Sequence, residues 1–262
     1  MKIIAISGYK SFIGNHFYNN YKKKNKIIHY KNNINNISEL KKFIIKNKVT
    51  HFVNFAGLSR IKCSKNKTEC IKTNFNSIKS VINFFNKFKY KPMFIFISTC
   101  HIYGNSNNKI KENFRIAPNS LYAKIKLKSE EYIQKNYENY SILRLFNVYG
   151  PNQPRSFFIP DMIEKIKNNQ LIKIDKSIRD FIHVRTVSRV INFIISKEIT
   201  GVLNVGSGRG QSLKSIINLI GNKLEKKPLL EISNKKSKIV ANIKFLTSKG
   251  FKFKKNEKNF NI

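Results

Sequence analysis

The chain has 262 residues, 41% of them hydrophobic, which is enough to bury a substantial core in one large domain or two small ones. It lacks the run of about 18 apolar residues that a membrane-spanning helix needs. Its net charge is +37, but the lysines are spread along the whole chain and form no arm or stripe. We therefore expect no membrane partner, and nucleic-acid binding that is nonspecific if it occurs at all.

The three cysteines, Cys63, Cys70 and Cys100, are odd in number and contain no C-x-x-C pair. This pattern disfavours both a disulfide framework and a zinc site, and it fits a reducing cytosol. The first residues are too few for a signal-peptide core and lead directly into a glycine turn, so we expect them to form a strand. A cytoplasmic location is the resulting prediction.

Apolar runs alternate with longer amphipathic stretches, as in a parallel sheet covered by helices. Strands are expected at residues 2–7, 27–31, 51–55, 94–98, 141–146 and 202–205, and helices at 12–22, 37–46, 70–88, 121–135, 159–168 and 212–224. Several of these strands are continuously apolar, which indicates burial on both faces. The predicted fold class is α/β with a doubly wound parallel sheet.

The regular alternation ends near Tyr149 and Gly150, and shorter, less regular elements follow. We therefore expect a first domain over residues 1–148 and a smaller lobe over residues 149–262. Some segments of the lobe are expected to return to the sheet of the first domain.

A glycine turn follows the first expected strand and opens the first expected helix, which is the context of a dinucleotide-binding turn. Gly8 would permit the tight turn, and Gly14 would permit close packing of the helix, whose N-terminus would face a pyrophosphate. The candidate cofactor-binding residues here are Gly8, Ser11, Phe12, Ile13 and Gly14. The β-carbon of Ser11 crowds the phosphates, although its hydroxyl can donate a hydrogen bond; a plain turn explains the pattern about as well.

Two later strands end in residues suited to a ligand. One ends in Phe55, Ala56 and Gly57, where a flat ring could approach the backbone, and another ends in the hydroxyl of Thr99. Because open parallel sheets bind ligands at the carboxyl ends of their strands, these residues should meet in one crevice.

Tyr122 and Lys126 lie one helical turn apart on one face of an expected helix. A nearby ammonium group favours the phenolate form of tyrosine, which makes the pair a usable acid/base near neutral pH. In so lysine-rich a chain the spacing alone also fits an amphipathic helix with a solvated lysine.

Taken together, these residues resemble those of the extended short-chain dehydrogenase/reductases of the nucleotide-sugar epimerase/dehydratase family. Residues 55–58 match the nicotinamide-side loop of UDP-galactose 4-epimerases, and Asn74 matches the family's helix asparagine. Thr99, Tyr122 and Lys126 match the catalytic residues, and three further signatures match at residues 143–151, 179–184 and 204–208. The resemblance implies a Rossmann-type fold that binds NAD or NADP and a nucleotide sugar, and a homodimer formed through the helix at 121–135.

The resemblance also implies roles for these residues. Tyr122 would transfer a proton to or from a sugar hydroxyl, Thr99 would bond the same oxygen, and Lys126 would hold the nicotinamide ribose and lower the pKa of Tyr122. Asn147 and Arg179 would contact the substrate diphosphate, a task suited to a cation with fork-like donors. The alternative is a structural asparagine and a surface ion pair between Arg179 and the adjacent aspartate.

Ser11 stands where the family's turn G-x-x-G-x-x-G has its middle glycine, and three further sites depart from the family pattern. Residues 29–31 contain no acid for the adenosine ribose and include a lysine, which favours NADP slightly over NAD. Asn33 replaces an adenine-binding aspartate, which predicts weaker binding. Cys100 and His101 stand where sugar 4,6-dehydratases carry an acidic pair, so dehydratase activity is disfavoured.

These observations predict an NAD(P)-dependent enzyme that acts at C4 of a nucleotide hexose, with a 4-epimerase favoured by residues 55–58. The first alternative is an NADPH-dependent reductase of 4-keto-6-deoxy sugars, which the missing ribose-binding acid and the compact lobe favour. The second is a degenerate, non-catalytic module that binds a nucleotide sugar.

Overall fold

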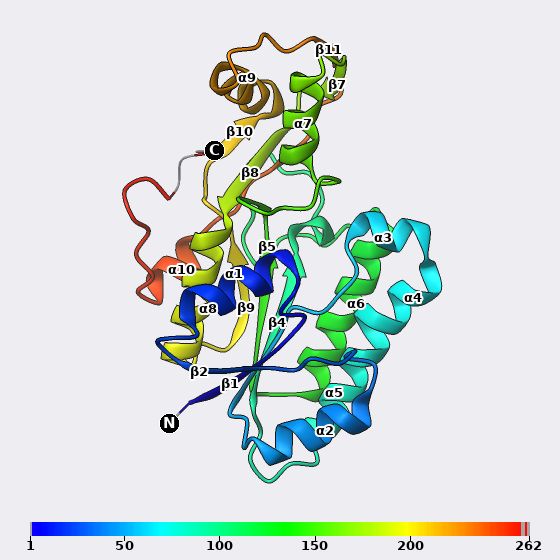
Figure 1. Ribbon diagram of the computed structural model, residues 1–262, viewed down its shortest axis with the longest axis vertical. Helices are drawn as coiled ribbons and strands as arrows, with labels where there is room; N and C mark the ends of the chain where they lie inside the picture. The colour runs from blue at the N-terminus through cyan, green and yellow to red at the C-terminus, as the bar shows by residue number, and fades with distance from the viewer. Residues whose placement is uncertain (1, 258–259, 261–262) are drawn as a thin grey trace. The chain divides into compact units, whose positions relative to one another are not determined.

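The computed structural model describes residues 2–257 and 260. Within these residues the chain forms two compact units (Figure 1). The first unit consists of Met1–Gly104, Arg115–Leu145 and Ser188–Leu203, and the second of Asn105–Phe114, Phe146–Val187 and Asn204–Ile262. Each unit is described by itself below.

A sheet of six strands in the described part of the chain has the order β2-β1-β3-β4-β5-β9. Its strands are β1 (Ile3–Ser7), β2 (Lys26–His29), β3 (His51–Asn54), β4 (Met93–Thr99), β5 (Tyr140–Leu145) and β9 (Gly201–Val205). The pairs among β2, β1, β3, β4 and β5 are parallel. The chain extends the sheet to one side of β1 with β2 and to the other side with β3, so the β1/β3 boundary is the switch point at which open α/β sheets bind ligands. The predicted α/β class is confirmed.

The strands form because their sequences are apolar on both faces. Phe52 of β3 and Phe94 and Phe96 of β4 have no exposed surface, and the rings of Phe52 and Phe94 stack with centroids 6.1 Å apart. Burial of each such ring contributes about 1.5–3 kcal/mol. This core holds the strand ends in place and therefore positions the site residues that follow them.

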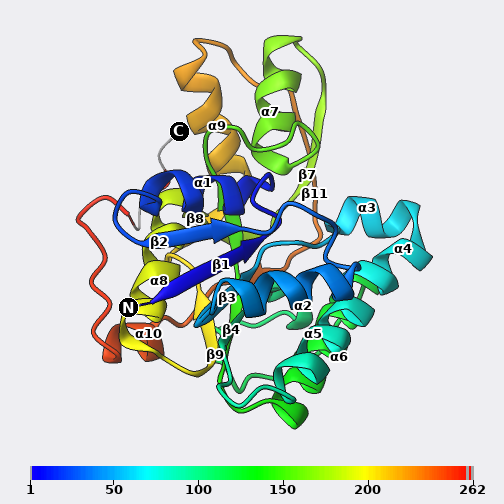
Figure 2. The same ribbon diagram turned by 60° about the horizontal axis from the view of Figure 1, so that its bottom comes forward.

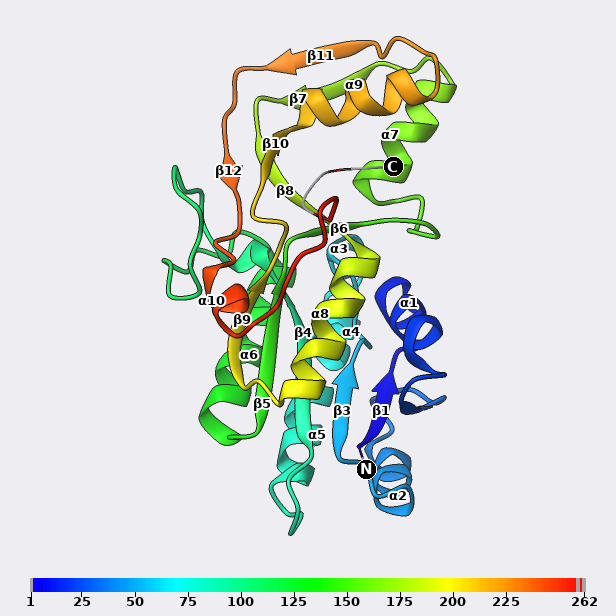
Figure 3. The ribbon, with the colours of Figure 1, turned by 90° about the vertical axis from the view of Figure 1, so that its left-hand side faces the viewer.

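Helices cover both faces of the sheet. On one face α2 (Ile37–Lys46) packs against α5 (Ser77–Phe85), which packs against α6 (Leu121–Asn136). On the other face lie α1 (Phe12–Tyr21) and α8 (Val184–Lys197); Figure 2 shows α1 and α2 on opposite sides of β1 and β2, and Figure 3 shows α8 in front of the sheet. The side chains of Ser11, Asn36 and Ser120 cap the starts of α1, α2 and α6 by accepting a backbone N–H.

The predicted helix at residues 70–88 is a composite. It contains the end of α4 (Lys67–Ile71), a π-helical turn at Lys72–Asn76 and then α5. A short helix, α3 (Arg60–Lys65), precedes it. π-Helical turns are rare and occur frequently at functional sites. This turn carries Asn74.

The second unit has its own sheet and core. In a four-stranded sheet of its described residues, β8 (Ile178–His183) pairs with β6 (Asn147–Tyr149), β10 (Gly210–Ser212) and β12 (Lys238–Ile239). A separate pair joins β7 (Ile172–Asp175) to β11 (Leu230–Ser233), and α7 (Phe158–Lys167) packs against α9 (Leu213–Lys223). A further short helix, α10, covers Lys244–Ser248. The core of this unit contains Tyr149, Ile159, Met162, Phe181 and Ile217.

In the part of the chain that the structure describes, no helix is both long and apolar enough to cross a membrane.

Candidate active site

The glycine turn after β1 lies against the end of β3. Gly8 has a φ of +66°, and a β-carbon on it would lie 2.5 Å from the backbone nitrogen of Ala56. A β-carbon on Gly14 would lie 2.5 Å from the carbonyl oxygen of Gly8. Both glycines are therefore required by close approach, and the turn meets the β3 end at the switch point of the sheet.

Ser11 is the N-cap of α1. Its Oγ accepts a hydrogen bond from the backbone N–H of Gly14 at 3.2 Å. This bond uses the lone pairs of the hydroxyl and leaves its proton available to donate. Phe12 and Ile13 are partly buried in the first turn of α1, and the ring of Phe55 packs on Phe17 with centroids 5.6 Å apart.

Asn74 holds the segment after β3, residues 55–58, which we call the β3 loop. Its Oδ1 accepts from the backbone N–H of Leu58 at 2.8 Å, and its Nδ2 donates to the carbonyl oxygen of Leu58 at 3.0 Å. A β-carbon on Gly57 would lie 3.0 Å from Asn74 Oδ1 and 3.8 Å from Lys126 Nζ. Gly57 therefore sits between two of the predicted site residues, Asn74 and Lys126.

Thr99 ends β4, and its side chain lies close enough to that of Tyr122, the second residue of α6, to lower the pKa of the phenol. The Thr99 Oγ1 also accepts the backbone N–H of His101 at 3.2 Å, so the same hydroxyl caps the next turn. The pKa of Tyr122 is raised to about 12, chiefly by burial and also by the Cys100 thiol, while Thr99 lowers it. The structure thus brings the threonine and the tyrosine together in a desolvated environment.

Lys126 is buried, with 5% of its surface exposed. Its Nζ donates to the carbonyl oxygen of Ile97 at 2.7 Å and lies 4.4 Å from the centroid of the Phe96 ring. Burial lowers the pKa of Lys126 to about 8, and the carboxylate of Glu130 opposes this shift. The expected lowering of the Tyr122 pKa by Lys126 is not among the causes that act on Tyr122 here, where desolvation dominates.

Sequence reasoning missed the ion pair behind Lys126. Glu130 has no exposed surface, and Arg144 of β5 donates to it through Nε at 3.0 Å and Nη2 at 2.7 Å. Arg144 Nη1 donates to the hydroxyl of Tyr103 at 2.6 Å, and Ser98 donates to Glu130. The signal was present, because Glu130 lies one helical turn after Lys126 and therefore shares its face.

The predicted adenosine side is aromatic and amide-rich. The ring of His29 lies 4.2 Å from that of Tyr9 and 5.2 Å from that of Tyr18, measured between centroids. Asn33 is exposed, and its Oδ1 accepts the backbone N–H of Asn35 at 2.9 Å, which fixes the turn after β2. Lys31, which also lies in this segment, is exposed. Aromatic rings and an amide therefore stand at the positions where the family pattern has acidic residues.

Asn147 and Arg179 lie in the second unit. Asn147 Nδ2 donates to the backbone carbonyl oxygen of Asp180 at 2.9 Å, and Arg179 Nη2 donates to Ser237 Oγ at 2.6 Å. Asp180 itself has no exposed surface. It therefore does not form the surface ion pair with Arg179 that the sequence left open.

Asp180 instead binds the segment at residues 204–208. Its carboxylate accepts from Ser207 N at 2.8 Å, Ser207 Oγ at 2.6 Å, Gly208 N at 2.9 Å and Ala241 N at 3.1 Å. Burial raises the pKa of Asp180, while these hydrogen bonds lower it. Two of the sequence signatures are therefore structural partners of each other.

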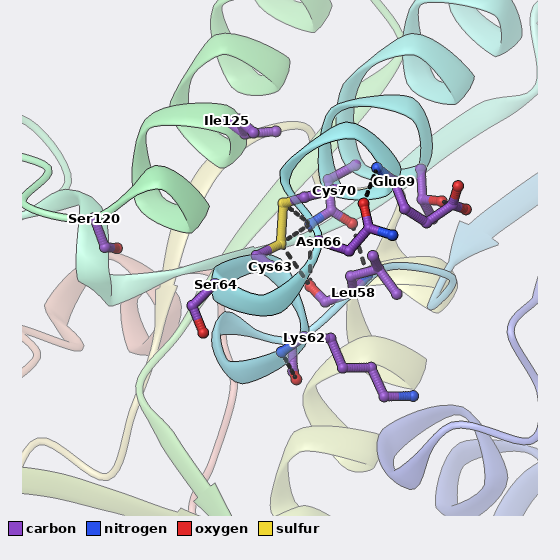
Figure 4. The surroundings of a disulfide bond; sticks show 12 residues. Leu58, Lys62, Cys63, Ser64, Asn66, Glu69, Cys70, Ser120 and Ile125 are labelled. Carbon is purple, nitrogen blue, oxygen red and sulfur yellow. Dashed lines mark hydrogen bonds between the residues drawn. A yellow bond between two sulfur atoms is a disulfide. The ribbon is translucent and has the colours of Figure 1, made fainter.

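The expectation that a disulfide is disfavoured is wrong. Cys63 of α3 and Cys70 of α4 form a disulfide, with Cα atoms 4.9 Å apart (Figure 4). The prediction failed because an odd cysteine count does not prevent one pair from forming, and the turn between two short helices brings these two together. The cysteine pattern consequently no longer supports a reducing compartment.

The sequence profile of the NAD dependent epimerase/dehydratase family matches residues 4–206. The chain belongs to this family. The match covers the glycine turn, the β3 loop, Asn74, and the Thr99, Tyr122 and Lys126 group described above. The resemblance inferred from these motifs is therefore confirmed.

Curated relatives in this family differ in their reactions. An uncharacterized UDP-glucose epimerase of Bacillus subtilis is 27% identical over 151 residues, which are 54% of this chain and 48% of that protein. A dTDP-4-dehydro-6-deoxyglucose reductase of Escherichia coli is 32% identical over 142 residues, which are 49% of this chain and 44% of that protein. The chain thus spans about half the length of the curated relatives it matches.

Solved structures share the fold. The UDP-N-acetylglucosamine 4-epimerase of Methanobrevibacter ruminantium superposes with a TM-score of 0.85 over 98% of this chain and 94% of its own, at 22% identity. At this identity the likeness establishes the fold alone.

Proposed function

We propose that the protein is an NAD(P)-dependent enzyme that acts at C4 of a nucleotide hexose, as a 4-epimerase. The observation that carries this proposal is the placement of Tyr122 at the start of α6, where Thr99 at the carboxyl end of β4 lowers its pKa and Lys126 follows one helical turn later. A base, a hydroxyl that orients its target and a cation are what removal of a proton and a hydride from one carbon requires.

The residues present fit a dinucleotide. The glycine turn approaches the β3 loop so closely that a β-carbon on Gly8 would clash, and it leads into the N-terminus of the ten-residue helix α1. Gly57 leaves the backbone of the β3 loop open beside Asn74 and Lys126. A nicotinamide held by these residues would supply hydride-transfer chemistry beside Tyr122 and Lys126. The lack of an acid at residues 29–31 and the presence of a lysine there favour NADP slightly.

Tyr122 would accept the proton of the C4 hydroxyl during oxidation and return it during reduction. The Thr99 hydroxyl would bond the same oxygen, and Thr99 lowers the pKa of Tyr122, which favours the phenolate. Lys126 would hold the nicotinamide ribose. Desolvation opposes the phenolate, so a cation close to Tyr122 is needed before this group can act as a base near neutral pH.

Asn147 and Arg179 would bind the diphosphate of the substrate. Arg179 supports this role because it is half-buried, and two of its guanidinium nitrogens bond the carbonyl oxygen and the hydroxyl of Ser237, a fork of donors that suits a diphosphate. A homodimer formed through α6 completes the proposal, on the family resemblance alone.

A reductase of 4-keto sugars is the second candidate, favoured by the 32% identity to the Escherichia coli reductase and by the missing ribose-binding acid. The two differ in cofactor handling: an epimerase regenerates its nicotinamide within each cycle, and a reductase exchanges it. Incubation of the protein with UDP-, dTDP- and GDP-sugars, with and without added NADPH, separates them. Isomerised product without added NADPH supports the epimerase, and product that requires stoichiometric NADPH and a 4-keto sugar supports the reductase.

A non-catalytic binding module is the third candidate, motivated by Ser11 in place of a glycine and by the raised pKa of Tyr122. Titration of NADH and NADPH, followed by nicotinamide fluorescence, tests it. Absence of binding of both, with a nucleotide sugar still bound, would replace the enzymatic proposal by the module.

A further inference from the structure

We propose that Cys63 and Cys70 are a thiol-oxidation site whose redox state controls the position of Asn74 and, through Asn74, of the β3 loop. The link from the disulfide to the loop stands on geometry alone. Its consequence for cofactor affinity rests on the proposed function.

The disulfide packs against residues of the β3 loop and of α6, which carry parts of the candidate active site. Cys63 has 1% of its surface exposed and Cys70 none, and both pack with Ile125 of α6. Leu58 of the β3 loop and Tyr122 pack against the same cluster. Figure 4 shows Leu58 and Ile125 around the bridge. A change in the bonding of the two sulfurs would therefore act directly on residues of both the β3 loop and α6.

Asn74 connects the sulfurs to the loop. Its Nδ2 lies 3.4 Å from Cys63 Sγ and 3.6 Å from Cys70 Sγ, and the same nitrogen donates to the Leu58 carbonyl oxygen at 3.0 Å. Since the Oδ1 of Asn74 accepts the Leu58 N–H, both backbone polar groups of Leu58 depend on this one amide. The oxidised sulfurs only accept hydrogen bonds, so they orient the Nδ2 hydrogens toward themselves and toward Leu58.

Reduction would change what the sulfurs can do. Cys63 Sγ lies 3.8 Å from the Leu58 carbonyl oxygen, which is only a contact while the sulfur has no proton. A Cys63 thiol would have an S–H that can donate to that oxygen, in competition with Asn74 Nδ2. Two thiols also need more room than a bonded pair, and the surrounding cluster is buried. Reduction is therefore expected to displace the Asn74 amide and loosen Leu58.

The surrounding segment suits exchange with a small acidic disulfide. The bridge joins two helices of only six and five residues, and residues 64–68 between the two cysteines are exposed, so local opening can expose the sulfurs. Arg60, Lys62, Lys65 and Lys67 surround the bridge in sequence, against Glu69 as the acidic residue. This charge favours a low-molecular-weight thiol or disulfide that carries carboxylates.

Oxidation of Cys63 and Cys70 by a small disulfide takes two thiol–disulfide exchange steps. The thiolate of one cysteine attacks a sulfur of the small disulfide, forms a mixed disulfide and releases one small thiol. The thiolate of the other cysteine then attacks the protein sulfur, forms the Cys63–Cys70 bond and releases the second small thiol. Two electrons pass from the protein pair to the small disulfide, and the two protons leave with the released thiols. Reduction by a dithiol reverses both steps.

The first test is the state of the cysteines in the purified full chain. Alkylation after denaturation without reductant should label Cys100 alone, and alkylation after reduction should label all three cysteines. The Cys100→Ala variant, which lacks that thiol, should show no label before reduction. Labelling of Cys63 and Cys70 in protein equilibrated with oxidised glutathione would overturn the proposal.

The second test measures the link to the loop without reference to function. Hydrogen exchange should show the Leu58 amide exchanging about tenfold faster in protein reduced with dithiothreitol than in oxidised protein, since its acceptor is displaced. A peptide from β4 should be unchanged. The Cys63→Ala/Cys70→Ala variant, which has neither the S–H donor nor the two sulfurs, should show the same Leu58 exchange with and without reductant. Equal exchange of Leu58 in both redox states of the wild type would overturn the link.

The third test depends on the proposed function. Oxidised protein should bind NADPH or NADH more tightly than reduced protein, by a fewfold. If neither state binds a nicotinamide cofactor while Leu58 exchange still responds to reduction, the proposed function fails and the redox link stands. If both states bind equally and Leu58 does not respond, the redox link fails and the proposed function stands.

Discussion

The two units treat polar groups that are removed from water in different ways. In the second unit, the Asp180 carboxylate has no exposed surface and accepts four hydrogen bonds from Ser207, Gly208 and Ala241. In the first unit, Tyr122 and Lys126 are also desolvated, but Lys126 donates to one carbonyl, and Thr99 is the side chain that lowers the raised pKa of Tyr122.

The difference separates a structural group from a reactive one. A buried charge with several donors is held in one state and stabilises the segments that supply them. A buried acid or base with few partners has a shifted pKa and retains capacity for a ligand. The pKa of Lys126 at about 8 and that of Tyr122 at about 12 belong to the second kind. The comparison therefore predicts that substitutions of Tyr122 or Lys126 lower turnover, whereas substitutions of Asp180 lower the stability of the fold.

The largest expected effect is on turnover. Tyr122→Phe should lower the rate by about 10²–10⁴-fold, because it removes the proton-transfer group and retains the ring. Cofactor affinity, measured by nicotinamide fluorescence, should be nearly unchanged. Tyr132→Phe is the matched control on the same helix, where the hydroxyl bonds Asn83, and it should retain activity. Wild-type turnover in Tyr122→Phe would contradict the mechanism.

Asp180→Asn should reduce the free energy of unfolding by about 2–4 kcal/mol, since an amide cannot accept from all the donors that the carboxylate serves. Urea denaturation measures this loss. Asp161→Asn is the control, because Asp161 forms an exposed pair with Lys165 and should change stability by less than about 0.5 kcal/mol. Equal stability of the two variants would show that the Asp180 cluster is not structural.

Lys126→Met should raise the free energy of unfolding, because it removes a buried charge, and should lower turnover, because it removes the lysine proposed to hold the nicotinamide ribose. The folded-state pKa of about 8 lies below the unfolded value, so the buried charge costs stability below pH 8 and the cost is relieved as the pH rises toward about 10.4. The stability of the variant relative to wild type should therefore be highest below pH 8 and decline above it, by no more than about 3 kcal/mol. Lys124→Met, which alters an exposed lysine on α6, should show no such trend. A pH-independent difference for Lys126→Met would show that Lys126 is not desolvated.

The smallest effect concerns Ser11. Ser11→Gly should cost only a few tenths of a kcal/mol, because glycine also serves as an N-cap, whereas Ser11→Ala should cost about 1 kcal/mol. The same Ser11→Gly change removes the β-carbon that crowds the phosphates, so cofactor affinity should rise. Thermal unfolding and nicotinamide titration measure the two effects. Weaker cofactor binding in Ser11→Gly would show that the serine hydroxyl contributes a contact of its own.

Local patterns were sufficient for the elements that carry most of the candidate site. The sequence predicted α2 at residues 37–46, which is the helix observed, and it predicted β4 and α6 to within a residue or two at their ends. Apolar runs specify strands, and i, i+4 spacing places Tyr122 and Lys126 on one face, because both are properties of a short segment. The resemblance to the family rested on the same local motifs.

Contacts between distant segments decided the rest. The helix α8 was not predicted, and a disulfide was considered disfavoured. The surface ion pair of Arg179 and Asp180, which the sequence left open as an alternative, is excluded because Asp180 is buried and accepts from Ser207, Gly208 and Ala241. Thr99 caps a turn and also lowers the pKa of Tyr122, and the second effect depends on where α6 packs. Sequence alone determined which residues can do chemistry, whereas tertiary structure determined how far each is desolvated and by which partners, because burial and pKa depend on groups that lie far away along the chain.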